Sequence, residues 1–76
     1  MPIFYFDVRD GEDVSQDQEG TELPDLNAAL AEAECVARDL AIEALKRSAK
    51  VDGCQIEILD ADKQRRAVFL VREVVQ

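Results

Sequence analysis

The sequence has no histidine, no tryptophan and only two cysteines in 76 residues. The absence of histidine excludes catalytic triads built on imidazole, and the common zinc sites of Cys and His cannot be assembled from this chain alone. No apolar run approaches the roughly 20 residues of a membrane-spanning helix. No basic stretch followed by an apolar segment opens the chain, so we expect no secretory signal and a cytoplasmic location.

Aromatic residues are also few, with three Phe and one Tyr, and ten of the apolar residues are alanines. At this length folding hides only about 60% of the surface that the unfolded chain exposes. We therefore expect a single domain over residues 1–76, with one layer of packing between a helix and a sheet.

Negative charge dominates the N-terminal third of the chain. Residues 7–25 carry eight acidic side chains and one cation, Arg9, which gives −7 of the total −8. Nucleic acids and anionic membranes bind through Lys and Arg, so neither is an expected partner. The cluster of Lys63, Arg65 and Arg66 is typical of a solvated hairpin end.

Secondary structure follows from two periodicities. Residues 3–8 are aromatic and branched and predict a strand with Phe4 and Phe6 on one face, and Asp10-Gly11 predicts a turn into a weak return strand over 14–18. Asp25 is a candidate N-cap for a helix over 26–47, whose buried stripe we expect to comprise Leu26, Ala29, Leu30, Ala33, Val36, Ala37, Leu40 and Ala44. Residues 54–58 and 67–71 predict two further strands joined by a turn at 60–63.

This order predicts an α+β domain of ββαββ type, with one long amphipathic helix on one face of a small, mainly antiparallel sheet of three to four strands. The opposite side of the helix also carries an apolar row at Ala31, Cys35, Ile42 and Leu45. The uncovered sheet face would present Ile3, Tyr5, Val68 and Leu70. Two apolar surfaces on so small a domain favour a protein partner, and we expect a homodimer.

Cys35 and Cys54 are too far apart for a Cys-x-x-Cys motif, and we interpret both as reduced packing residues. Cys35 lies among Glu32, Glu34 and Asp39, which is the opposite of the cationic pocket that a nucleophilic thiolate needs. The carboxylate pairs of the acidic segment have no evident deep pocket for acid–base chemistry. We therefore expect no enzyme activity and no cofactor.

The acidic segment invites a calcium hypothesis. Aligning Gly20 with the glycine of an EF-hand loop places Leu26 where the bidentate glutamate should stand, so that motif is absent. Weak binding of a divalent cation by Asp17, Glu19 and Glu22 is still compatible with the sequence. The alternative function is therefore binding of a divalent cation or a small ligand by residues 7–25. Arg9, the single cation there, is expected to pair with one or two of the surrounding acids.

The chain resembles a bacterial family of small stand-alone proteins classed as a domain of unknown function. The resemblance rests on an aromatic first strand, an Arg-Asp-Gly turn, an Asp-x-x-Gly-x-Glu-Leu segment, an alanine-rich helix and the strand at 55–58. It implies a shared loop motif at Arg9, Asp10, Gly11, Asp17, Gly20 and Glu22. It brings no established activity, and where members of the family often carry His this chain has Asp7.

Taken together, the sequence favours a small acidic protein that acts by protein–protein contact or regulation and associates with itself.

Overall fold

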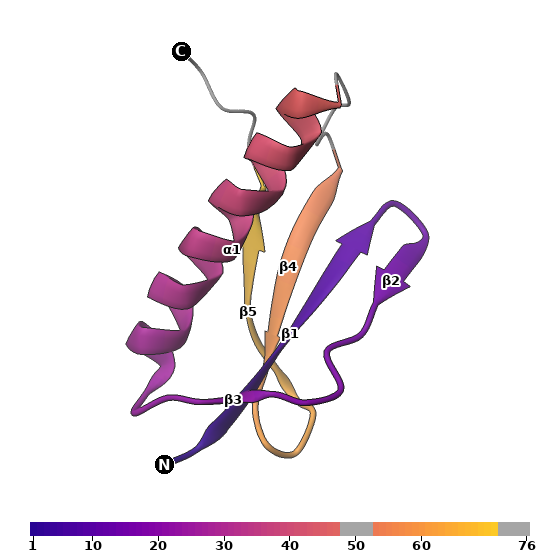
Figure 1. The fold of residues 1–76 in the computed structure, drawn as a ribbon. Coiled ribbons are helices and arrows are strands. Elements are labelled where there is room, and N and C mark those ends of the chain that lie inside the picture. Colours follow the sequence, from indigo (N-terminus) through magenta and orange to yellow (C-terminus); the bar gives the residue numbers. More distant parts are fainter. Residues whose placement is uncertain (48–52, 72–76) are drawn as a thin grey trace.

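The structure is a computed structural model that describes residues 1–47 and 53–71. Within these residues the chain forms strands β1 (Ile3–Asp10), β2 (Asp13–Ser15) and β3 (Thr21–Glu22), helix α1 (Leu26–Lys46), and strands β4 (Cys54–Leu59) and β5 (Arg65–Leu70) (Figure 1). The expected α+β class and the order of strands around one helix are confirmed. The sheet has five strands because two short ones, β2 and β3, flank β1.

All strand pairs are antiparallel, and the sheet runs in the order β2-β1-β4-β5. β2 and β3 share one edge of β1: β2 lies opposite Val8–Asp10, and β3 lies opposite Ile3 and Phe4. The return strand predicted over 14–18 is therefore shorter, at Asp13–Ser15, and β3 was not expected. β4 lies along the other edge of β1, with Phe6 opposite Ile58.

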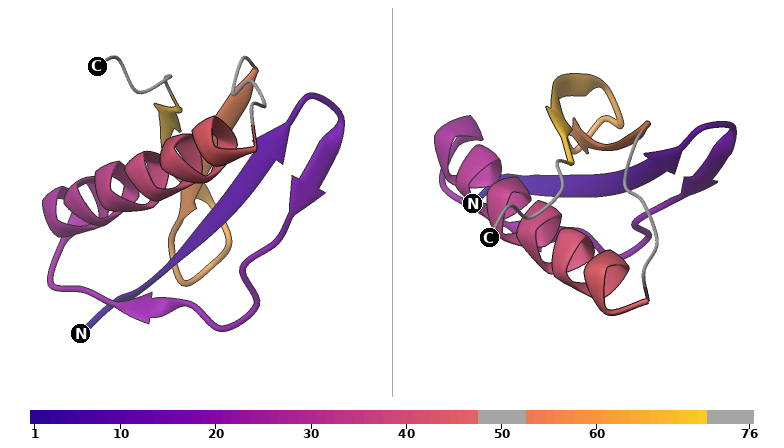
Figure 2. Two further views of the ribbon diagram at one scale, coloured as in Figure 1. Left: turned by 45° about the horizontal axis from the view of Figure 1, so that its top comes forward. Right: turned by 90° about the horizontal axis from the view of Figure 1, so that it is seen from above.

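Helix α1 packs on one face of this sheet, mainly against β4 and β5 (Figure 2). Its N-terminus begins as predicted, because the Asp25 side chain accepts the Ala28 N–H at 2.8 Å. A free N–H at that position would otherwise have no partner, and such a cap contributes about 1 kcal/mol. The helix ends near Lys46, whose charge opposes the negative end of the helix dipole.

The buried stripe of the helix consists of alanines, at positions 29, 33, 37, 41 and 44. Small side chains let the helix axis approach the sheet closely. Leu30, Val36 and Leu40 pack against the same core, whereas Leu26 is 36% exposed and lies at the margin. Ala41 was missing from the predicted stripe. The other half of the core comes from the strands, with Phe4 and Phe6 from β1 and Ile56 and Ile58 from β4.

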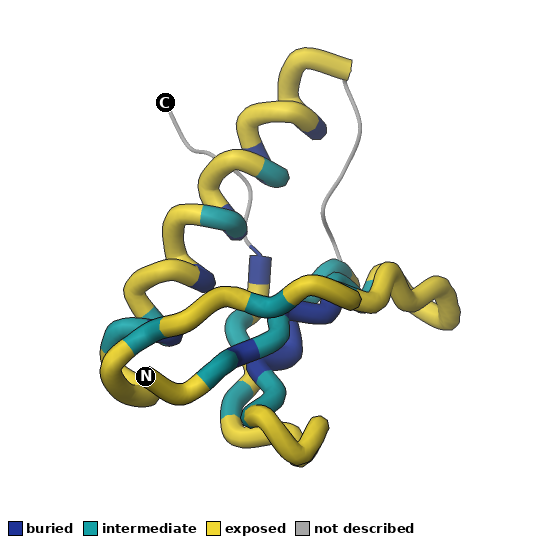
Figure 3. The backbone as a smooth tube through the Cα atoms, turned by 60° about the horizontal axis from the view of Figure 1, so that its bottom comes forward, coloured by how far each residue is buried: buried dark blue, intermediate teal, exposed yellow. Residues whose placement is uncertain are grey.

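The opposite face of the sheet, the open face, carries no helix formed by residues 1–47 or 53–71. Because side chains alternate along a strand, it receives Tyr5, Asp7 and Arg9 from β1, Glu57 from β4 and Val68 and Leu70 from β5. Figure 3 shows exposed residues along the outward side of α1 and buried ones on its inward side and on the central strands. None of the described helices has the length and hydrophobicity to cross a membrane.

Candidate functional site

Asp17 organises the segment between β2 and β3. Its Oδ2 accepts the Phe6 N–H of β1 at 3.1 Å, and its Oδ1 accepts the N–H groups of Glu19 at 3.2 Å and Gly20 at 3.1 Å. Burial raises the pKa of this carboxyl, but the hydrogen bonds from Gly20, Phe6 and Glu19 and the charge of Lys63 outweigh it, so the pKa is lowered overall. Between the parts of β1 that pair with β2 and β3, the Asp17 side chain thus accepts a backbone N–H that a neighbouring strand would otherwise bind.

Asp7 is the second half of this arrangement. Its Oδ1 accepts the backbone N–H of Asp17 at 2.9 Å, so the two aspartates are joined in both directions between β1 and the segment that runs beside it. Although no helix covers the open face, Asp7 is only 7% exposed. A carboxyl group at such depth needs donors, and Asp17 supplies one of them.

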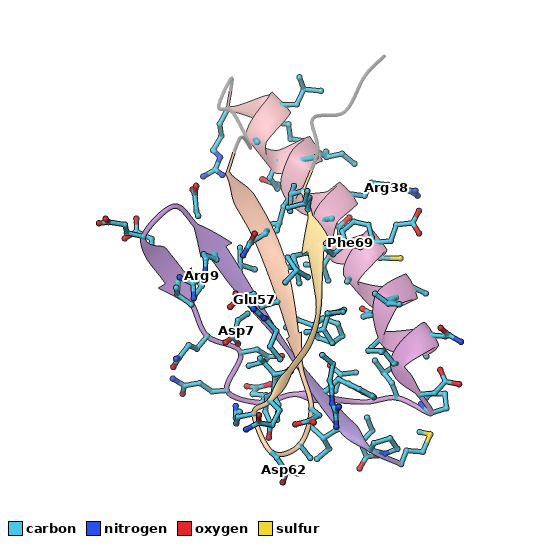
Figure 4. All side chains as sticks on the ribbon, turned by 180° about the vertical axis from the view of Figure 1, so that it is seen from behind. Asp7, Arg9, Arg38, Glu57, Asp62 and Phe69 are labelled. Atoms are coloured by element: carbon cyan, nitrogen blue, oxygen red, sulfur yellow. The ribbon has the colours of Figure 1, made fainter. Side chains whose placement is uncertain are left out.

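Glu57 is the other buried carboxylate of the open face. It lies directly opposite Asp7 in the β1–β4 pair and accepts hydrogen bonds from Arg9 at 3.3 and 3.5 Å, Arg65 at 3.3 Å and Gln55 at 3.5 Å. Figure 4 shows Asp7, Arg9 and Glu57 at neighbouring positions. Burial raises the pKa of Glu57, but its hydrogen bonds and ion pairs with Arg9 and Arg65 lower it further than burial raises it.

This pairing corrects one expectation. Arg9 does form an ion pair, but with Glu57, 48 positions along the chain, and not with the acids around it in the sequence. The reason is the strand register: Arg9 lies opposite Gln55, and Glu57 is the next residue on the same face of β4.

The turn between β4 and β5 is fixed by Asp60, whose side chain accepts the N–H groups of Asp62 at 2.9 Å and Gln64 at 3.0 Å and the Arg66 guanidinium at 2.8 Å. Within this turn Lys63 has a φ of +64°, the left-handed region that lysine rarely adopts. Its Nζ lies 3.3 Å from the centre of the Tyr5 ring, a cation–π contact.

A pocket of about 350 Å³ opens between this turn and the 16–18 segment. The pocket is lined by Asp7, Gln16, Asp17, Gln18, Leu59 and Lys63. It combines carboxylate, ammonium, amide and apolar groups on the open face. Its lining residues come from β1, the β2–β3 segment and the β4–β5 hairpin, so the sequence brings them together only through the fold.

The residues of the expected loop motif separate in space. Asp17 and Gly20 meet directly, and a side chain at Gly20 would lie 2.6 Å from Ile3 Cγ2 and 3.0 Å from Tyr5 Cε1. Glu22 lies exposed in β3, and Asp10 and Gly11 form the tight turn at the far end of β1. The motif therefore contributes Asp17 and Gly20 to the architecture beside the pocket. Asp7, Leu59 and Lys63 were not predicted as site residues, and the sequence predicted Lys63 only as part of a solvated hairpin end.

The apolar row on the helix is exposed along its length, and Ile42 and Leu45 are 37% and 48% exposed. Cys35 lies exposed in this row, and Cys54 is partly buried at the start of β4; both are free thiols. Burial, together with the nearby charge of Asp10, raises the pKa of the Cys54 thiol. Among residues 1–47 and 53–71, no group of three or more His, Cys, Asp and Glu residues is placed to hold a metal ion.

In a comparison with known families, the family model described as Domain of unknown function (DUF6894) matches residues 3–75. Neither a curated protein nor a solved structure matches the chain.

Proposed function

The chain belongs to the DUF6894 family, a domain of unknown function, and we propose that it is a non-enzymatic interaction module that works as a homodimer joined through β5. The observation that carries the proposal is the outer edge of β5. No described strand pairs with this edge, and its side chains Val68 and Leu70 are 41% and 55% exposed on the open face.

The backbone of β5 is oriented for such pairing. The Val71 N–H donates to the Cys54 carbonyl of β4 at 3.1 Å. In an antiparallel pair the residues that bond to the neighbour alternate with residues whose N–H and C=O point away. Val68 and Leu70 therefore point their backbone groups outward, beyond the sheet.

A second copy of the same strand meets these groups well. A two-fold axis at Val68 makes the two Val68 residues a hydrogen-bonded pair, and branched side chains opposite each other favour strand pairing. The same axis places the cationic ends of the two strands, at Arg65 and Arg66, at opposite ends of the interface. Like charges are thus kept apart, and residues 67–70 contribute no charge and no proline to block the contact.

The apolar row of the helix is the competing surface, and one experiment separates the two. We expect the protein to sediment at twice its 8.5 kDa mass and Val68→Lys to sediment as a monomer, because an edge lysine disfavours strand pairing. The matched control is Ile42→Asp, which places a charge at an equally exposed position of the helix and should leave the dimer intact.

Circular dichroism of both variants establishes that each one is folded. A monomeric parent protein overturns the proposal. If Val68→Lys remains a dimer and Ile42→Asp is a monomer, the proposal is also overturned. The interface then lies on the apolar row of the helix, at Ala31, Cys35, Ile42 and Leu45.

A further inference from the structure

We infer that the pocket between the 16–18 segment and the β4–β5 turn binds a small amino acid, with the ligand's ammonium group at Asp7 and its carboxylate at Lys63. The inference concerns a different part of the open face from the β5 edge and does not depend on the dimer. The volume of the pocket, about 350 Å³, lies at the lower end of the range for small-molecule sites.

Asp7 supplies the first argument. Its Oδ1 is occupied by the Asp17 N–H, whereas Oδ2 has no hydrogen-bond partner among the described residues. In the same part of the chain every fully buried side-chain oxygen or nitrogen has a partner. Oδ2 is therefore accessible from outside, and the pocket is the opening that Asp7 lines. A residue that is 7% exposed thus presents one free acceptor oxygen to the pocket.

Asp17, by contrast, is already used. Its two oxygens accept three backbone N–H groups, and this bonding holds the pocket wall in place. Among the lining residues, Asp7 is consequently the carboxylate that still has an oxygen available to bind a positive group or an N–H donor of a ligand.

Lys63 supplies the opposite charge. Its backbone is left-handed and its Nζ lies over the Tyr5 ring, and no ion pair joins Lys63 to a carboxylate in residues 1–47 and 53–71. Glycine adopts this left-handed backbone at about 1 kcal/mol lower cost, so the lysine retains strain at a position that lines the pocket.

The two charges explain the ligand class. Asp7 and Lys63 line one pocket without pairing with each other, which leaves a gap between an acceptor and a donor of opposite charge. A simple amine would satisfy Asp7 but meet repulsion from Lys63, and a simple anion would meet Asp7 and Asp17. A molecule with both charges satisfies both ends, and Leu59, Gln16 and Gln18 leave an apolar and amide lining for its neutral part.

The test is a titration of the isotope-labelled protein followed by ¹H–¹⁵N NMR. The probes are the twenty α-amino acids together with β-alanine and 4-aminobutyrate, which vary the distance between the charges. Methylamine and acetate serve as probes with a single charge. We expect at least one amino acid to bind with a Kd of about 1 mM or tighter and to shift the amides of residues 7, 16–18 and 63.

Two variants assign the site. Asp7→Asn keeps an acceptor for the Asp17 N–H, and Lys63→Met removes the charge, together with its cation–π contact to Tyr5, in an exposed turn. Each variant should weaken binding about tenfold or more. Asp62→Asn, in the same turn but outside the pocket lining, should bind like the parent protein. If Asp7→Asn proves unfolded in its own spectrum, Lys63→Met still decides the assignment.

The inference is overturned if no probe shifts these amides up to about 10 mM, which is tenfold above the expected Kd. It is equally overturned if methylamine or acetate binds as tightly as the best amino acid, or if Lys63→Met leaves binding unchanged.

Discussion

Asp7 of β1 and Glu57 of β4 stand opposite each other across the open face, each only 7% exposed. Like charges directly opposite in a strand pair repel, and this pair persists because each carboxylate has separate donors. Asp7 accepts a backbone N–H, and Glu57 accepts two arginine side chains and a glutamine amide. The face without a helix is thus held together by polar contacts rather than by apolar packing.

Glu57 should make the fold sensitive to acid. Its pKa is lowered in the folded state, so the unfolded chain binds more protons between the two values, and stability present above the ordinary pKa of 4.5 is lost as the pH falls through the folded value. Glu57→Gln should cost about 1 kcal/mol at pH 7, a modest figure because Arg9 and Arg65 are 40% and 60% exposed.

Urea unfolding at pH 7 and at about pH 3 measures this effect. The difference in free energy of unfolding between Glu57→Gln and the parent protein should be smaller at the lower pH. Glu43→Gln removes an exposed helix ion pair and serves as the control. A gap of the same size at both pH values would contradict the assignment.

Asp17→Asn should destabilise the protein by about 1 to 3 kcal/mol, because an amide nitrogen cannot accept one of the N–H groups that the carboxylate now binds. Hydrogen exchange of the Phe6 amide is the local readout and should accelerate more than that of Ile58. Asp13→Asn, on the exposed strand β2, should change neither quantity appreciably. An unaltered Phe6 exchange rate in Asp17→Asn would argue against the role of this side chain as a strand substitute.

Gly20 and Gly11 have similar backbone angles but different surroundings. Both have positive φ, at +75° and +64°, so alanine is strained by about 1 kcal/mol at either site. At Gly20 the added methyl group would also collide with Ile3 and Tyr5, whereas at Gly11 it meets open space. Thermal unfolding should therefore show a loss for Gly20→Ala at least about twice that for Gly11→Ala. Equal losses would mean that the contact with β1 contributes nothing.

The two thiols should differ in reactivity. Cys35 is exposed, whereas Cys54 is partly buried and has a raised pKa, so less of it is thiolate at pH 8. Dithionitrobenzoate should modify Cys35 at least about tenfold faster, and Cys35→Ser should abolish the fast phase. Loss of the fast phase in Cys54→Ser would reverse the assignment.

Salt should strengthen the proposed dimer. Each chain carries a net charge of −8, so two chains repel one another at long range, and added salt screens that repulsion within a Debye length of about 10 Å at 0.1 M. The dimer Kd from sedimentation should fall as sodium chloride rises from about 20 mM to about 200 mM. An interface made of intermolecular ion pairs would show the opposite trend.

The sequence carried enough information for most of the architecture. Alternation around Phe4 and Phe6, the alanine spacing of the helix and the carboxylate of Asp25 are local signals, and the structure confirms each of them. β3 was not predicted because two residues are too few to show an alternating pattern, and its pairing with Ile3 and Phe4 of β1 joins residues distant in the sequence.

The side-chain contacts of the open face and of its pocket could not be predicted, because they also join residues that are distant in the sequence. The pairing of Arg9 with Glu57 depends on the register between β1 and β4, and the position of Lys63 over Tyr5 depends on the backbone of a turn. Neither relationship leaves a periodic trace in the sequence. The acidic composition of residues 7–25 does not separate Asp17, whose oxygens accept backbone N–H groups, from Asp7, whose Oδ2 has no partner among the described residues.

The two edges of the sheet differ in a way that limits the addition of further strands from other molecules. Beyond β1 the sheet ends with three residues of β2, the Asp17 carboxylate and the short β3, whereas no strand of residues 1–47 or 53–71 pairs with the outer edge of β5. In the proposed dimer, pairing of two β5 strands covers this edge in both molecules, and the edges left outside are those formed by β2, Asp17 and β3. We therefore expect the proposed dimer to close at two copies instead of adding further chains, because the strand edge that favours aggregation in other proteins is covered in it.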